Sequence, residues 1–111
     1  MEEPEMSEVK FDLGRTVMTK GAIAIALRMA GCESAPRDRQ PILAGIALRP
    51  FLARHQSGDW GDLGEGNKLA NDADVNTGGR LLSKYETSAG ALYIITEHDR
   101  SVTTVLRPDE Y

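Results

Sequence analysis

The sequence has little cysteine, no long hydrophobic run and no charged-then-apolar leader before its first acidic residues. Its one cysteine, Cys32, has no partner for an intramolecular disulfide, so the expected compartment is a reducing cytosol. The longest apolar run, residues 22–27, falls far short of the about 20 residues that a membrane-spanning helix needs. We therefore expect a cytoplasmic protein that does not enter the membrane.

The common catalytic and nucleotide-binding motifs are also absent. There is no phosphate-binding loop, dinucleotide fingerprint, nucleophile elbow, zinc-protease motif or paired C-x-x-C. Cys32 stands beside Glu33 and lacks a neighbour that would favour the reactive thiolate. These absences predict a protein that is not an enzyme and that has no catalytic residue, metal site or cofactor of its own.

Aliphatic residues must fill the core, because only 5% of the 111 residues are aromatic. This length is typical of one domain. Residues 1–8 are acidic and lack periodic apolar positions, which predicts a disordered tail; its alternative role is an acidic docking arm. Residues 9–111 are predicted to form a single domain.

Charge is distributed unevenly along the chain. The formal net charge is −4; residues 9–58 hold eight basic and three acidic residues, and residues 59–111 hold five basic and ten acidic residues. Such asymmetry can give a folded domain two electrostatically distinct regions. Nucleic-acid binding is therefore expected only of the first half, which has no strongly basic stripe.

The first half of the chain is predicted to be mainly helical. Residues 9–18 alternate in part, which indicates a first strand or extended segment. Thr19 as N-cap and Gly31 as C-terminal stop bracket a buried helix over residues 21–30. Residues 41–56 predict two short helices or one kinked helix, because Pro50 interrupts them.

The second half is predicted to be mainly sheet. A marginal surface helix is expected over residues 62–74, followed by strands over residues 80–86, 91–96 and 101–106. Short polar loops between these strands predict an antiparallel meander, with the last strand at a sheet edge. The predicted fold class is α+β, with N-terminal helices packed on a three-stranded antiparallel meander and with an N-terminal strand as an optional addition.

Several segments resemble a family of small uncharacterised proteins encoded on plasmids and integrative elements. The resemblance covers residues 11–31 and 51–111 and is carried by the sequences GDWG (58–61), GGRLLS (78–83), IITEHDRSVTTVL (94–106) and PDEY (108–111). Members are sometimes labelled plasmid-related or restriction-associated. The chain departs from the family pattern between Gly31 and Phe51, where it is longer, and at His98, which replaces a small residue.

Two polar segments are candidates for partner binding. In the first, at the end of the second helical segment, Trp60 is either an exposed aromatic anchor with polar neighbours or a plug in the core, with Asp59 capping the next helix and His55 bonded locally. In the second, the hairpin turn after residue 96, Asp99 and Arg100 are either contact residues or turn residues, with Asp99 bonded to its own backbone and Arg100 paired with a carboxylate. The residues predicted to bind a partner are Arg54, His55, Asp59, Trp60, Asp62, Asp72, His98, Asp99 and Arg100.

The leading functional prediction is a mobile-element accessory protein that binds another macromolecule. The resemblance implies a protein partner in host defence, as for an anti-CRISPR or antirestriction inhibitor, and homodimerisation through a sheet edge stays open. One alternative is a nucleic-acid-binding regulator that uses Arg28, Arg37, Arg39, Arg49 and Arg54. Another is a metal-dependent hydrolase that combines His55 and Asp59 with the carboxylates of the hairpin.

Overall fold

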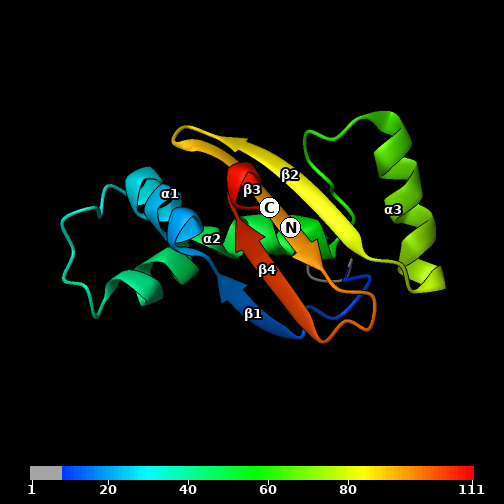
Figure 1. The fold of residues 1–111 in the computed structure, drawn as a ribbon, viewed down its shortest axis with the longest axis horizontal. Helices are drawn as coiled ribbons and strands as arrows, with labels where there is room; N and C mark the ends of the chain where they lie inside the picture. Colours follow the sequence, from blue (N-terminus) through cyan, green and yellow to red (C-terminus); the bar gives the residue numbers. More distant parts are fainter. Residues whose placement is uncertain (1–8) are drawn as a thin grey trace, which may run out of the picture.

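The computed structural model describes residues 9–111, and the tail predicted for residues 1–8 lies outside the described residues. The chain is an α+β protein in which a four-stranded mixed sheet carries helices (Figure 1). Its elements, in chain order, are β1 (Arg15–Met18), α1 (Lys20–Ala30), α2 (Gln40–Gln56), α3 (Glu65–Thr77), β2 (Leu81–Thr87), β3 (Gly90–Thr96), β4 (Val102–Leu106) and the 3-10 turn η2 (Pro108–Glu110).

The sheet has the strand order β1-β4-β3-β2, which corrects the predicted three-stranded antiparallel meander. The three later strands pair antiparallel as expected, but β1 pairs parallel with β4, from Arg15 beside Val102 to Met18 beside Val105. The prediction that the last strand lies at an edge is therefore wrong, because β1 covers it. Gly14, at φ 66°, permits this approach, since a Cβ there would overlap the Ser101 carbonyl.

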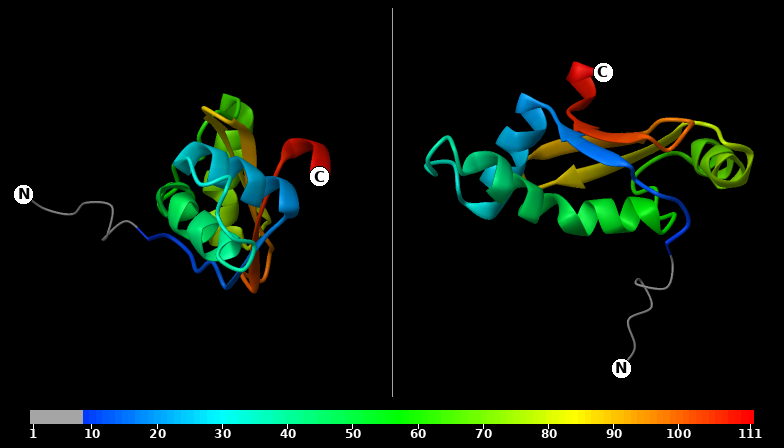
Figure 2. Two further views of the ribbon diagram at one scale, coloured as in Figure 1. Left: turned by 90° about the vertical axis from the view of Figure 1, so that its left-hand side faces the viewer. Right: turned by 90° about the horizontal axis from the view of Figure 1, so that it is seen from below.

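One face of the sheet is covered by α1 and α2, whereas η2 lies against the opposite face (Figure 2). The covered face carries the buried side chains of Tyr85, Leu92, Ile94 and Val105, as the alternation of each strand requires. On the other face, the Tyr93 and Tyr111 rings lie 5.9 Å apart. The last residues of the chain thus shield part of the face that the main helices leave open.

The first two helices follow from local signals, with one correction. Thr19 caps α1 by accepting a hydrogen bond from the Ala22 amide, and Gly31 ends it in the left-handed conformation, as predicted. α2 is one helix of 17 residues with Pro50 inside it, so of the two predicted alternatives the pair of short helices is wrong and the single helix holds. Ala44 and Leu48, both fully buried, hold the part before Pro50 against the core, and the fully buried His55 holds the part after it.

α3 begins three residues later than the predicted surface helix and is thinly packed. Gly64 is its N-cap and Asn71 is its one buried residue. The Asn71 amide group donates to the Leu82 carbonyl at 2.7 Å and accepts from the Leu82 amide at 3.3 Å. This two-way contact ties the helix to the outer edge of β2. No helix among the described residues is long and apolar enough to cross a membrane.

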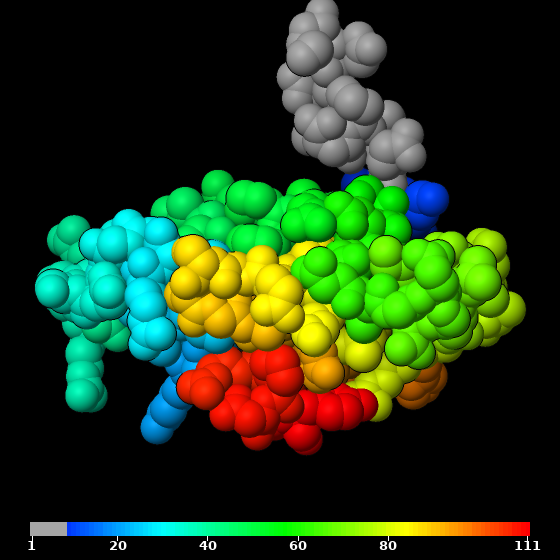
Figure 3. All heavy atoms as spheres, turned by 90° about the horizontal axis from the view of Figure 1, so that it is seen from above, coloured from blue at the N-terminus to red at the C-terminus, as the bar shows by residue number. Residues whose placement is uncertain are grey.

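The uneven charge of the sequence becomes a separation in space. The α1–α2 end and α3 lie at opposite ends of the molecule, with the β2–β3 hairpin between them (Figures 1 and 3). Residues 20–49, at the first end, include five basic and two acidic residues, and residues 59–77, at the other, include five acidic and one basic residue. We call these the basic end and the acidic end.

Candidate functional site

The first predicted site forms a tight corner between α2 and α3. Arg54, in the last turn of α2, donates to the Asp59 carboxylate at 2.7 Å, and the Asp59 amide donates back to the Arg54 carbonyl at 2.9 Å. The hydrogen bond from Arg54 holds the pKa of the Asp59 carboxyl below its ordinary value, with a smaller contribution from the Gly61 amide. Asp59 therefore fixes the turn. One alternative predicted that it caps the next helix, and that prediction is wrong, because α3 has Gly64 as its N-cap and no side-chain cap.

Trp60 lies inside the protein, so its indole is not an exposed anchor. Only 3% of it is exposed, its ring stacks against Phe11 with centroids 6.1 Å apart, and its Nε1 donates to Asp72 at 2.9 Å. Asp72 reaches the indole from α3. The Asp59/Trp60 corner is therefore closed by its own contacts, with carboxylates left at its rim.

The same segment fills the edge of the sheet beside β2. Gly61 forms an isolated parallel bridge with Lys84, and the Asp62 carboxylate accepts from the Glu86 amide at 2.9 Å. Gly61 has φ 76°, and a Cβ there would overlap the Lys84 carbonyl oxygen. The GDWG sequence therefore gives a turn that approaches a neighbouring strand more closely than any residue with a side chain permits.

His55 belongs to a buried hydrogen-bond network. Its side chain has no exposed surface; Nδ1 lies 2.6 Å from Ser83 Oγ and Nε2 lies 2.9 Å from Thr96 Oγ1. Thr96 Oγ1 lies 2.7 Å from Thr103 Oγ1, and Thr103 donates to the Leu13 carbonyl at 2.6 Å. The network joins α2, β2, β3, β4 and the segment before β1. The alternative that predicted local bonding of His55 is therefore wrong.

The proton positions in this network follow by elimination. The Leu13 carbonyl only accepts, so the Thr103 hydroxyl hydrogen points to it and Thr96 must donate to Thr103. Thr96 then accepts from His55 Nε2, which carries the proton, and Nδ1 accepts from Ser83. Every member is satisfied only when the imidazole is neutral. Burial, with a smaller effect from Arg100, lowers the pKa of His55 from 6.5 to about 3.

A hydroxyl within hydrogen-bond reach of an imidazole is the geometry of an activated nucleophile. Ser83 and His55 meet that distance, but neither has exposed surface through which a substrate reaches it. The pair also lies within a chain of hydroxyls whose protons are all directed internally. The arrangement positions elements of the core and does not form an open reaction site.

The second predicted site, the β3–β4 turn, supports α3. Asp99 accepts from the Ser101 amide at 3.1 Å and its hydroxyl at 2.6 Å, as the turn alternative predicted, and His98 is exposed. Arg100 does not pair with a carboxylate as expected. Its guanidinium donates to the carbonyls of Asp74 at 2.8 Å and Gly79 at 2.6 Å, and so caps the C-terminal end of α3.

The structure therefore brings the two predicted sites to the acidic end but buries two of their residues. His55 and Trp60 are enclosed; Arg54, Asp59, Asp62, Asp72, His98 and Asp99 are exposed, and Arg100 is partly exposed. No three His, Cys, Asp or Glu side chains within residues 9–111 group as metal ligands. The ligand set that the hydrolase alternative needs is thus not assembled there.

Two features were missed by sequence reasoning. The first is the network of buried hydroxyl groups around His55. The sequence did indicate it, because the alternation of the strand places the polar Ser83 between Leu81 and Tyr85 on the covered face. The second is a hollow of about 530 Å³ beside α1, lined by Lys20, Arg28 and Arg37 among others. The loop that lines this hollow connects α1 to α2.

Comparison with family models, with curated proteins and with solved structures found no match to this chain.

Proposed function

We propose that the chain is a non-enzymatic binding protein whose acidic end docks a protein with a basic surface. The observation that carries this proposal is the exposure of α3. Only Asn71 of its 13 residues is buried, and Leu69 is 67% exposed beside the exposed Ala70 and Ala73. An apolar strip on a helix that contributes little to its own core is typical of a surface that packs on a partner.

The surroundings of Leu69 define the chemistry of the partner. The acidic end carries Asp59, Asp62, Glu65, Asp72 and Asp74, with Lys68 as the one basic residue of residues 59–77. A basic surface on the partner would complement this charge, raise the association rate at low salt and leave Leu69 to contact an apolar position. The exposed residues predicted from sequence, such as Asp62 and Asp72, form the rim of this surface.

The internal contacts of the carboxylates decide which of them are useful in a test. Asp59, Asp62 and Asp72 each hold part of the fold, so neutralising them would disturb the corner as well as the surface. Glu65 is bound only to Lys68, at 3.8 Å, one turn along the helix. Glu65 and Leu69 are therefore the positions that report on docking.

A role in mobile-element biology, as an inhibitor of a host-defence protein, is our proposal for the process. It rests on the resemblance to the plasmid-encoded family and on the acidic end, since host proteins that bind nucleic acid present basic grooves. A net charge of −4 is modest, so close mimicry of DNA is not part of the proposal.

The test compares two exposed apolar positions at opposite ends of the molecule. A photo-crosslinking amino acid is placed at Leu69 or at Ile42, which is 66% exposed, and adducts formed in the native host are identified. We expect one basic protein to be crosslinked from position 69 and not from position 42. With that protein purified, Leu69→Ala and Glu65→Gln should each raise the dissociation constant, and Ile42→Ala should not. Adducts only from position 42, or a dissociation constant unchanged by Leu69→Ala, would refute docking through α3.

A further inference from the structure

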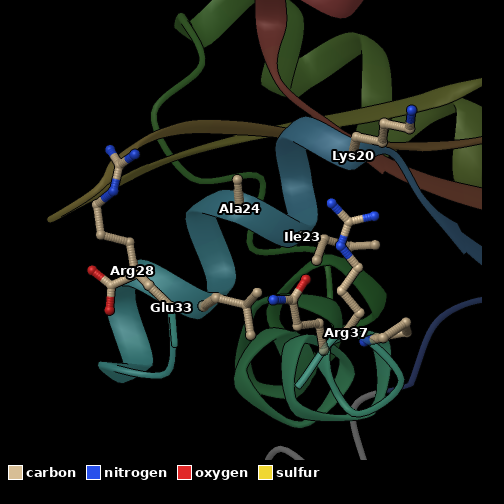
Figure 4. A pocket seen from close by; sticks show the side chains of 9 residues that line it. Lys20, Ile23, Ala24, Arg28, Glu33 and Arg37 are labelled. Atoms are coloured by element: carbon tan, nitrogen blue, oxygen red, sulfur yellow. The ribbon is translucent and has the colours of Figure 1, made fainter. Parts of the chain in front are cut away.

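At the basic end, a hollow of about 530 Å³ lies between α1 and the loop that leads into α2. Its cationic lining residues are Lys20, Arg28 and Arg37, and none of them forms an ion pair with another described residue. Figure 4 shows Lys20 and Arg37 on one side, Arg28 on the other and the small side chain of Ala24 between them. The arrangement places cationic side chains on both sides of a low floor, with the Glu33 carboxylate on the same side as Arg28.

The apolar part of the lining is equally specific. Ile23 and Pro41 contribute aliphatic surface above the buried Leu27, and Gln40 contributes an amide. Gln40 donates to the Ala35 carbonyl at 3.0 Å, so its carbonyl oxygen stays available to a ligand donor. A purely ionic ligand such as free phosphate would leave this apolar wall unused. The hollow suits a ligand that combines anionic groups with flat, weakly polar ones.

The hollow also continues along α1. A second hollow, of about 320 Å³, shares Ala24 and Arg28 with the first and extends toward the β2–β3 hairpin. Arg107 lines this second hollow but is paired with Asp109 at 2.9 Å, so it adds length and little charge. The two hollows together form one groove, which we call the α1 groove.

Helix geometry sets the spacing of the positive charges. Lys20, Ala24 and Arg28 are four residues apart and therefore share one face of α1. At about 1.5 Å per residue, Lys20 and Arg28 are about 12 Å apart along the helix axis, which exceeds the reach of a single phosphate group. The groove therefore suits an extended polyanion with several phosphates.

We propose that the α1 groove binds single-stranded nucleic acid. Lys20, Arg28 and Arg37 contact successive phosphates, and unstacked bases pack on the aliphatic surface of Ile23 and Pro41. A duplex is not favoured, since its bases are stacked inside and would leave that surface uncovered. The groove has no aromatic lining residue, so binding is expected to be weak and independent of base sequence. This site lies at the opposite end from the proposed protein-docking surface and does not depend on it.

The test measures fluorescence anisotropy with a labelled ten-nucleotide oligothymidylate and the full chain. Three phosphate contacts predict that log K falls with log salt with a slope of about −2, at about −0.7 per contact on single strands. Arg28→Ala and Arg37→Ala should each weaken binding about tenfold at low salt and reduce the slope to about −1.4. Arg15→Ala, at an exposed arginine of β1 that lines neither hollow, is the matched control and should change neither value.

Two further variants test the groove itself. Glu33 is the acidic residue in the lining of the larger hollow, so Glu33→Gln should tighten binding, a direction that damage to the fold would not produce. Ala24→Gln should block the floor and weaken binding without changing net charge, and its thermal midpoint should stay close to that of the wild type. No binding at 20 mM salt, an equal loss with Arg15→Ala, or equally tight binding of duplex DNA, thymidine monophosphate or polyglutamate would overturn the proposal.

Discussion

The buried imidazole of His55 predicts that the protein loses stability in mild acid. Its pKa is lowered from 6.5 to about 3 by burial, so the unfolded chain binds a proton below pH 6.5 that the folded chain refuses. The stability of the folded state therefore falls as the pH drops below 6.5. Each pH unit between the two pKa values costs about 1.4 kcal/mol, so at pH 5 the loss is about 2 kcal/mol.

Urea unfolding at pH 7, 6 and 5 at constant ionic strength measures this loss, with the fluorescence of Trp60 as the signal. Trp60 is the one tryptophan of the sequence, and its buried ring lies beside the His55 ring, with centroids 5.6 Å apart. Working above pH 5 separates His55 from Asp59, whose lowered pKa reduces stability only in stronger acid. The window from pH 7 to pH 5 therefore reports on the imidazole.

His55→Gln supplies the critical comparison. Glutamine does not titrate and still offers a polar group to the hydroxyls, so the variant should be less stable at pH 7 but lose little more by pH 5. His98→Gln, at the exposed hairpin tip, is the control and should keep the full pH dependence of the wild type. A free energy of unfolding that changes by less than about 0.5 kcal/mol between pH 7 and pH 5, or an unchanged slope in His55→Gln, would refute the buried neutral imidazole.

Two more predictions concern backbone and capping. Gly61→Ala should destabilise the fold by more than about 2 kcal/mol, because it combines a positive φ with overlap against Lys84. Gly66→Ala in α3 should instead stabilise the fold by about 0.5–1 kcal/mol. Urea unfolding measures both changes, and equal effects would contradict the close approach of Gly61 to Lys84. Arg100→Gln should lower the free energy of unfolding by about 2 kcal/mol, because it removes charged hydrogen bonds to backbone carbonyls such as that of Asp74. Amide hydrogen exchange should then become faster in α3 before it does in other elements. Equally faster exchange across the whole sheet would argue against a local cap.

Local patterns predicted much of the fold because each is set by neighbouring residues. Thr19 and Gly31 bracket α1 as capping chemistry requires, and alternation with short polar loops located all three antiparallel strands to within one residue at each end. For α2 the sequence left open a break or a single kinked helix at Pro50, because the missing hydrogen bond is a local cost. The burial of Ala44 and Leu48 before Pro50 and of His55 after it offsets that cost and is a tertiary effect.

The parallel pairing of β1 with β4 escaped prediction because its causes are distant in the chain. β1 has four residues, three of them exposed, so its own pattern is weak. What holds it is Thr103, which donates to the Leu13 carbonyl across 90 residues, and Gly14, which lets the chain approach Ser101. The same limit applies to the candidate site, since the orientation of Trp60 depends on Asp72 of a separate helix.

The distribution of unused charge decides which residues are functional candidates. At the corner and the hairpin turn, the polar groups that looked most reactive form hydrogen bonds within the protein. Arg54 donates to Asp59, and Arg100 donates to backbone carbonyls. Beyond these contacts, acidic residues surround the exposed Leu69 at the acidic end, and basic residues surround apolar surface in the α1 groove at the basic end. Lys20, Arg28 and Arg37 form no ion pair with a described residue, so a ligand can neutralise them at the basic end. At the acidic end Asp59, Asp62 and Asp72 hold part of the fold, so Leu69 and Glu65 are the positions through which a partner is expected to act. Binding at one end should therefore respond to salt independently of binding at the other, and Glu65→Gln should leave oligothymidylate affinity nearly unchanged.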